Sequence, residues 1–537
     1  MDKIIGFSMT RGVALSDPPW LYKYPWLKVK QLTIRDWIFT LWGHGDFDKF
    51  ISGDQIVVGY SDIDLEVLSI DPLENRGLVI RLGEGQVTTT NDALGMLPVF
   101  YANKNGIPCV STCEEVLLQA LGKVTLDPGR LVSYLIYQST VGILTLWKEI
   151  NKLYANSILK VSADGCFEQV PQPPLEFHST RDNAVEEMFE VTKDTVRRYT
   201  DPLDRIVLPL SSGQDSRLIL CNIQRPERVR ARSYPCSWPA ERSWEIAISK
   251  ESARLCRVNN FGILDFERDY STWTQKAIEY YGTSVSGVQV YLYGASEMIG
   301  EEESGLPVVS GVIGDVLAGI GIGFIKDMPS PYDLFRRGCY CQDKEWKPNH
   351  LDACLNYNWR EALEPVKSDG AKIWDNTEGD SLFVRSTLIR LRNRCSQTIT
   401  YPWAALDLWG SIVPVYCDRN YVQSMLSFPV DKLRDRNCQQ EMIAKYFPKI
   451  WPHAGLNLNT MNCTNTMNTE TIRNGGLRSI WPLAVNGSKP AHKLFKPSGI
   501  KTLVNQALAG DVQTWFLSQS LQTVAWAVDK GYAGGIE

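Results

Sequence analysis

The chain has 537 residues, of which 44% are hydrophobic, and this size allows two or more domains that each bury a core. Its formal net charge of −5 gives no general attraction to nucleic acid or to anionic membranes. No apolar run reaches the length of about 18 residues that predicts a transmembrane helix. We therefore expect a cytoplasmic protein without a signal peptide, with neither nucleic acid nor membrane as a partner.

The cysteines and histidines give no metal or disulfide signal. The 13 cysteines are scattered without a C-x-x-C pair, and the 5 histidines are isolated from one another. This pattern predicts free thiols instead of a disulfide framework or a zinc site. The 17 tryptophans should lie mostly in the core or in a substrate cleft.

Short apolar strands separated by turns dominate the first 170 residues. Strands are expected at residues 3–7, 55–60, 77–82, 97–101, 108–111 and 157–161. Two helices are expected between them, at residues 114–121 and 127–139. Many strands with few helices favour a two-layer sandwich. The sequence Pro171-Gln172-Pro173-Pro174 then predicts a stiff linker, followed by an amphipathic helix over 181–199.

A loop after a short apolar run is the strongest signal in the sequence. Residues 206–210 are typical of a strand buried in a parallel sheet, and a helix is expected from Arg217 onward. A small polar loop before a helix N-terminus is a natural anion site. Asp215 would repel phosphates unless a divalent metal lay between them, so the loop predicts a magnesium–triphosphate site. The alternative is an ordinary turn capped by serine and aspartate. The candidate ligands are Ser211, Ser212, Gly213, Asp215 and Ser216.

Strands and helices alternate after this loop. Strands are expected at 229–234 and 306–310, and helices at 241–255 and 290–301. Alternation predicts right-handed crossovers and a parallel sheet, whose ligands bind at the carboxyl ends of the strands. A second small polar loop follows the strand at 306–310. Its candidate ligands are Ser310, Gly311, Gly314 and Asp315.

The last 200 residues are predicted to be mostly helical and irregular. The segment 385–397 contains Arg385, Arg390, Arg392 and Arg394, which is typical of a solvated helix face, with a phosphate or carboxylate site as the alternative. Residues 455–498 are rich in Asn, Thr, Ser and Gly, which favours either a segment that orders on binding or a mobile one.

Three motifs resemble one family. The loop S-S-G-Q-D-S at 211–216 is similar to the S-G-G-x-D-S pyrophosphatase loop of ATP-dependent amide-forming enzymes, with Ser212 in place of the first glycine. The loop S-G-V-I-G-D at 310–315 resembles the S-G-x-G-x-D-E loop of asparagine synthetase and β-lactam synthetase. The stretch N-D-A-L-G-M-L-P-V-F-Y at 91–101 resembles the D-x-x-G-x-x-P strand of class II glutamine amidotransferases. Together they place the chain near the asparagine synthetase superfamily.

The resemblance implies a two-domain α/β protein. Residues 1–170 would form an α+β sandwich of the Ntn glutaminase-like type, and 180–537 a parallel-sheet ATP-pyrophosphatase-type domain with helical additions. The family's nucleophilic cysteine follows the initiator methionine, whereas this chain has Asp2. The first domain is therefore expected to be a glutaminase fold without glutaminase chemistry.

The resemblance also implies a reaction. ATP and Mg²⁺ would be the cofactors, Asp215 and Asp315 would share the metal, and a substrate carboxylate would attack ATP to give an acyl adenylate and pyrophosphate. An amine would then form the amide. Val312 and Val316 replace family side chains of the second loop, and no lysine stands where the family has its late one. Lys449, Lys489, Lys493 and Lys496 are the alternatives, and the catalytic residue is left unassigned.

The resemblance leaves three functional hypotheses open. The leading hypothesis is a cyclisation within one substrate, as in lasso peptide cyclases, with a peptide precursor and a companion maturation protein as partners. An intermolecular transferase using free ammonia or another amine is the second hypothesis. The third is a nucleotide-binding pseudoenzyme that serves as a partner subunit.

Overall fold

The computed structural model describes residues 2–60, 73–177, 183–234, 244–264, 270–285, 290–320, 328–339, 348–450, 494–509 and 533–536, together with five single residues between 511 and 524. Most of the predicted Asn-rich segment 455–498, including Lys489 and Lys493, lies outside these residues.

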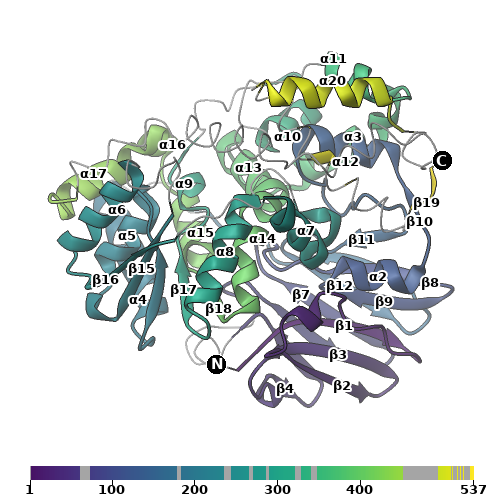
Figure 1. The fold of residues 1–537 in the computed structure, drawn as a ribbon, viewed down its shortest axis with the longest axis horizontal. Coiled ribbons are helices and arrows are strands. Elements are labelled where there is room, and N and C mark those ends of the chain that lie inside the picture. The colour runs from purple at the N-terminus through teal and green to yellow at the C-terminus, as the bar shows by residue number, and fades with distance from the viewer. Residues whose placement is uncertain are drawn as a thin grey trace.

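The first part of the chain forms two antiparallel six-stranded sheets (Figure 1). The first sheet runs in the order β11 (Ile150–Lys152), β8 (Phe100–Lys104), β9 (Ile107–Ser111), β1 (Lys3–Arg11), β3 (Trp37–His44) and β2 (Lys28–Ile34). The second runs in the order β13 (Phe167–Pro171), β12 (Ser157–Ser162), β7 (Gln86–Asn91), β6 (Leu78–Leu82), β5 (Gln55–Val58) and β4 (Ile51–Ser52). The helices predicted here are confirmed as α2 (Glu114–Leu121) and α3 (Pro128–Tyr137).

Alternating apolar side chains join the two sheets. Phe7 and Met9 of β1 share a core with Ile56 of β5 and Ile80 of β6, because alternate residues of a strand point to one face. Ile5 belongs to a different core, which also contains residues of the parallel sheet described below. The apolar core therefore continues from the antiparallel part into the rest of the chain.

One predicted strand lies later than expected. The strand predicted at 97–101 is β8, which begins at Phe100. The preceding residues form a turn instead, since the Asp92 carboxylate accepts the backbone N–H groups of Leu94 and Met96, and Gly95 adopts a φ of 65°.

A five-stranded parallel sheet follows, as the alternation of strands and helices predicted. Its order is β16 (Asn260–Ile263), β15 (Val229–Ser233), β14 (Ile206–Pro209), β17 (Pro307–Ser310) and β18 (Ser411–Pro414). The chain moves outward from β14 through β15 to β16, and then returns to the other side of β14 for β17 and β18. The associated helices are α4 (Ala184–Thr200), α5 (Gln214–Asn222), α6 (Trp244–Leu255), α7 (Tyr270–Tyr281), α8 (Val290–Glu302) and α9 (Gly314–Leu317).

The remainder is mainly helical. Its helices are α10 (Pro331–Cys339), α11 (Pro348–Cys354), α12 (Trp359–Asn376), α13 (Leu382–Ile389), a π-helix (Arg390–Thr400), α14 (Tyr401–Ala404), α15 (Arg419–Leu426), α16 (Val430–Leu433), α17 (Asn437–Tyr446) and α20 (Pro497–Leu508). Within the described residues, no helix has both the length and the apolar character needed to cross a membrane.

The arginine-rich segment 385–397 is not a solvated helix face, so that prediction is wrong. It forms α13 and the π-helix, and most of its residues are buried. Arg392 forms a bidentate ion pair with Glu378 and donates from Nε to Ala93 O at 3.0 Å. Arg390 donates to Ile320 O at 2.9 Å. Arg392 is buried and Arg385, Arg390 and Arg394 are half-buried, so packing removes much of this helix from solvent.

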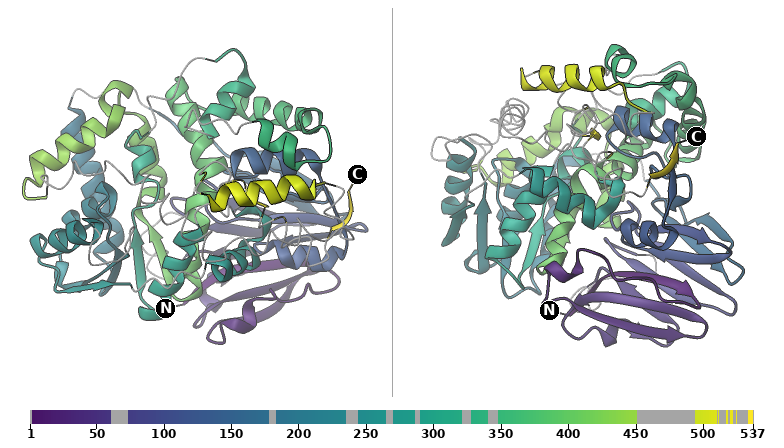
Figure 2. Two further views of the ribbon diagram at one scale, coloured as in Figure 1. Left: turned by 45° about the horizontal axis from the view of Figure 1, so that its top comes forward. Right: turned by 45° about the vertical axis from the view of Figure 1, so that its right-hand side comes forward.

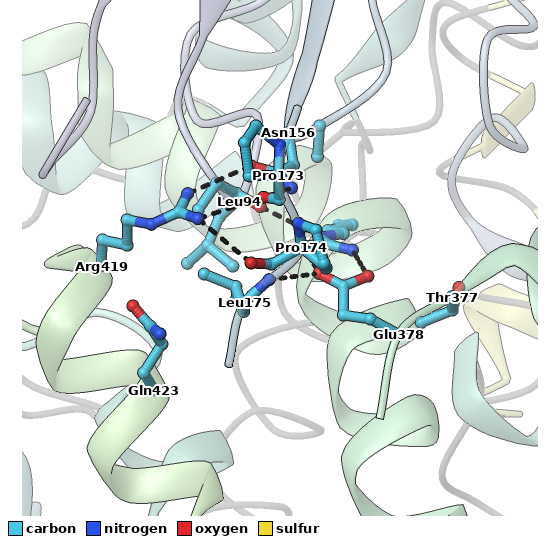
Figure 3. A network of polar contacts seen from close by, with 12 residues as sticks. Leu94, Asn156, Pro173, Pro174, Leu175, Thr377, Glu378, Arg419 and Gln423 are labelled. Atoms are coloured by element: carbon cyan, nitrogen blue, oxygen red, sulfur yellow. Dashed lines mark hydrogen bonds and ion pairs between the residues drawn. The ribbon is translucent and has the colours of Figure 1, made fainter. Parts of the chain in front are cut away.

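The proline linker is fastened to the helical part of the chain (Figure 3). Arg419 of α15 donates to Asn156 Oδ1 and to Pro173 O, both at 3.2 Å. The backbone N–H of Leu175 donates to Glu378 Oε1 at 3.4 Å. A charged side chain of α15 and one from the loop after α12 therefore hold the segment in place.

The C-terminal end returns to the first part of the chain. Strand β19 (Ala533–Ile536) pairs in parallel with β10 (Val124–Leu126). Figure 2 shows this yellow end beside the blue segment that contains β10. Residues beyond 180 thus also contribute to structure in the first 170.

Candidate functional site

The first predicted loop leaves the carboxyl end of β14 and enters α5. The helix begins at Gln214, three residues earlier than predicted, so Asp215 lies in its first turn. Ser211 and Ser216 shape the loop: their hydroxyl oxygens lie 3.2 Å apart, and the N–H of Gly213 donates to Ser211 Oγ at 3.1 Å. Ser212 Oγ is buried and has no hydrogen-bond partner among the described residues. Ser212 is therefore the loop hydroxyl best able to meet a ligand.

The second predicted loop leaves the carboxyl end of β17 and enters the four-residue helix α9. Ile313 adopts a φ of 63°, a conformation that costs a β-branched residue roughly 1–3 kcal/mol. Asp315 follows in the first turn of α9, where its Oδ1 accepts the N–H of Val316 at 2.9 Å. Ile313 stands where the resembling family has glycine, the residue that adopts this φ without strain.

The two loops meet. Strands β14 and β17 are neighbours, with Val207 opposite Val308. A Cβ atom on Gly311 would lie 3.3 Å from Asp215 Cβ, and one on Gly314 would lie 2.8 Å from Asp215 Oδ1. A side chain at position 314 would therefore clash with Asp215, whereas Gly311 is in tight contact with the first loop. The loops lie where the strand order reverses, which is the usual ligand site of such sheets.

The aspartates of the two loops influence each other electrostatically. Burial raises the pKa of Asp215, and the negative charge of Asp315 raises it further, while Arg436 opposes both effects. Two carboxylates placed so that they repel each other form a site that gains from a bound cation.

Two side chains from the α17 region hold Asp215. Arg436 Nη2 donates to Asp215 Oδ1 at 2.7 Å, and Gln439 Nε2 donates to the same oxygen at 3.1 Å. Arg436 has a φ of 63° and also donates from Nε to Gln439 Oε1 at 2.7 Å. Tyr416 donates its hydroxyl to the backbone oxygen of Asp215 at 3.1 Å. Sequence reasoning assigned no site role to any of these three residues, which lie more than 200 residues from Asp215 along the chain.

Arg217 supplies a buried positive charge behind the first loop. Its side chain is almost fully buried, and Nη1 and Nη2 have no hydrogen-bond partner among the described residues. Its Nε donates to Gly213 O at 3.2 Å. Burial lowers its pKa to about 10. An unpaired guanidinium beside a loop of backbone N–H groups fits an anionic ligand such as a phosphate.

The residues present fit a metal–phosphate complex better than a free metal ion. Within the described part of the chain, no group of three or more His, Cys, Asp or Glu side chains is suited to a metal. Asp215 and Asp315 supply two carboxylates, and Mg²⁺ commonly takes its other ligands from phosphate and water. The metal assignment therefore depends on a nucleotide, and Asp215 Oδ1 would have to be shared with Arg436.

Other sequence candidates are structural. Val312 and Val316 are buried. Lys496 donates to Asp352 O at 2.8 Å, beside α11. These contacts account for each of these residues without a ligand.

No protein-family model matches this chain, and no curated protein sequence matches it significantly. The likeness to the asparagine synthetase superfamily therefore stays a prediction from three motifs.

Proposed function

We propose that this protein is an ATP-dependent amide ligase that adenylates a substrate carboxylate and then joins it to an amine. The carrying observation is that the loops of Asp215 and Asp315 meet at the point where the parallel strand order reverses. The asparagine synthetase-like assignment, with a glutaminase-like first domain (1–170) and an ATP-binding second domain (180–537), belongs to this proposal. The antiparallel and parallel sheets support it.

Different side chains would bind the metal ion and the phosphates. Asp215 and Asp315 would hold a magnesium ion, which neutralises phosphate charge and so favours attack at phosphorus. Ser212 and Arg217 offer donors without partners in the described structure, and the N-terminal turn of α5 adds backbone N–H groups. The carboxylate oxygen attacks the α-phosphorus, and pyrophosphate leaves. The amine nitrogen then attacks the acyl carbon, AMP leaves, and the amine loses a proton.

For the amine we propose a group on the same substrate, as in a lasso peptide cyclase with a companion protein. An intramolecular amine needs no ammonia and gains the advantage of proximity. A non-catalytic nucleotide-binding subunit is the second candidate. Two observations favour it. The apolar Val312 is buried where the resembling enzymes have a reactive side chain, and Arg436 already neutralises the charge of Asp215.

The decisive experiment measures the melting temperature with and without Mg·ATP. Wild type should be stabilised by about 2.7 kcal/mol at 100 times the dissociation constant. Asp215→Asn and Asp315→Asn should lose this shift, and the control Asp194→Asn, an exposed residue of α4, should keep it. Equal shifts in all four proteins would contradict the site. Release of AMP and pyrophosphate with peptide substrates would then separate the ligase from the non-catalytic subunit.

A further inference from the structure

Two thiols outside the proposed nucleotide site lie close together. Cys221, in the last turn of α5, and Cys256, directly after α6, have their sulfur atoms 3.9 Å apart. Both residues are half-buried, unlike the fully buried cysteines elsewhere in the described structure. The helices that carry them follow adjacent parallel strands, β14 and β15.

The other described cysteines lack this combination of proximity and access. Cys166 is exposed, and Cys109, Cys113, Cys339, Cys354, Cys395, Cys417 and Cys438 are buried. Burial raises the pKa of the Cys113 thiol to about 12, which keeps it protonated and inert. Cys221 and Cys256 are therefore the described pair best suited to oxidation.

The surroundings of the pair favour a thiolate. The hydrogen bond between the thiols lowers the pKa of Cys256 and raises that of Cys221, so Cys256 is the sulfur that ionises first. The Arg217 guanidinium, one helical turn before Cys221, opposes this rise only in part, so the pKa of Cys221 stays well above its ordinary value. A nearby cation stabilises a thiolate once it forms.

We propose that Cys221 and Cys256 are a redox modification site that a peroxide converts into a reversible disulfide. The Cys256 thiolate attacks a peroxide oxygen, the O–O bond breaks, and the sulfur becomes a sulfenic acid as the leaving oxygen takes up a proton. Cys221 sulfur then attacks the Cys256 sulfur. The S–S bond forms, the S–O bond breaks, and hydroxide combines with the Cys221 proton as water. One peroxide is reduced, and two thiols are oxidised.

Closure must bring the two sulfur atoms closer together. A disulfide needs the sulfur atoms about 2 Å apart, so the side chains must rotate or the helices must approach each other. Helix α5 begins in the loop of Asp215. If the proposed nucleotide site is correct, oxidation should change the shift in melting temperature that Mg·ATP produces. The measurement with Mg·ATP rests on the proposed function, whereas the measurement of disulfide formation does not.

The test is peptide mapping of the full chain after treatment with hydrogen peroxide, quenching and alkylation. Trypsin should release residues 218–228 joined to residues 255–257, and each of these peptides contains one cysteine. The joined species should be lighter by two hydrogens than the sum of the peptides and should disappear on reduction. Cys221→Ser should abolish it and should allow a 1,3-diketone to trap the sulfenic acid on Cys256.

Cys166 is the matched control, because it is exposed and has the same chemistry without a neighbouring thiol partner in the described structure. Cys166→Ser should leave the joined peptides unchanged. The proposal is overturned if peroxide oxidises Cys166 while residues 218–228 and 255–257 remain separately alkylated. It is also overturned if Cys221→Ser leaves Cys256 no more reactive than Cys166.

Discussion

The ammonium group of Lys3 lies 2.7 Å from Asp407 Oδ1, and neither side chain exposes any surface to solvent. Arg76 Nη1 lies 2.5 Å from the other carboxylate oxygen, and His44 Nε2 lies 2.6 Å from the backbone oxygen of Asp407. Lys3 and His44 belong to the first antiparallel sheet, whereas Asp407 lies in the 3-10 turn Ala405–Leu408, shortly before β18. One carboxylate therefore joins the antiparallel part to the parallel sheet.

We expect Asp407→Asn to destabilise the fold by about 3 kcal/mol or more, because it leaves two cations buried without their counter-charge. Lys3→Met should cost less, since Arg76 still pairs with Asp407. The urea midpoint of unfolding measures the loss of stability in both variants. Asp36→Asn breaks the exposed Arg11–Asp36 pair and should have no measurable effect. A loss no larger than that control would contradict this account.

The same carboxylate predicts a response to acid. Burial raises the pKa of Asp407, but the charges of Arg76 and Lys3 outweigh it and hold the pKa below its ordinary value. The ionised Asp407 carboxylate therefore stabilises the fold fully above about pH 3.9, the pKa of an aspartate in the unfolded chain. This stabilisation is lost as the pH falls below that value. Wild type should lose stability below pH ~4 more steeply than Asp407→Asn, as measured by urea midpoints across that range.

Arg436→Met should cost about 2 kcal/mol, because Asp215 then loses its charged hydrogen bond. The pKa of Asp215 should rise further. A raised pKa gives stability that is full at low pH and is lost as the pH rises, so the cost should be larger at pH 8 than at pH 5.

Two further variants test this reading by urea unfolding. The double variant Asp215→Asn with Arg436→Met should lose less stability than the sum of the single variants, because the two groups interact directly. Arg434→Met removes an exposed arginine two residues away and should change little. Additive losses at Asp215 and Arg436 would show that the ion pair is not significant.

Lys152 should make stability depend on pH in the alkaline range. It is buried, with Nζ 2.7 Å from Thr140 Oγ1, and burial lowers its pKa to about 7, although the charge of Glu114 opposes this. A lowered pKa gives stability that is full above the unfolded pKa of about 10.4 and is lost as the pH falls toward 7. Between pH 7.5 and 9.5, the melting temperature of Lys152→Met should change less with pH than that of wild type. Parallel profiles would contradict the shift.

Arg419→Met should release the proline linker. Arg419 donates to the side-chain oxygen of Asn156 and to the backbone oxygens of Pro173 and Pro174 (Figure 3). Without Arg419 these three oxygens lose a charged donor. Limited digestion with a chymotrypsin-type protease should cut near Leu175 and Phe177 severalfold faster than in wild type. Arg254→Met, which breaks an exposed pair with Glu251 on α6, is the control and should leave the rate unchanged.

The sequence by itself determined the local elements. The apolar runs before Ser211 and Ser310 became β14 and β17, and the small polar loops after them became the entries to α5 and α9. Such features depend on neighbouring residues, whose propensities and turn chemistry can be seen in a short stretch. The alternation of strands and helices likewise determined the parallel sheet.

Only the tertiary structure decided which groups surround Asp215 and which charges are buried. Arg436 lies 221 residues from its partner Asp215 in sequence, and no local pattern connects them. The arginines of 385–397 were predicted to be solvated, but Arg392 is buried against Glu378, and Arg385 and Arg390 are half-buried and donate to backbone carbonyls. Burial and long-range ion pairing depend on how separate elements pack, and the sequence of one segment does not contain that information.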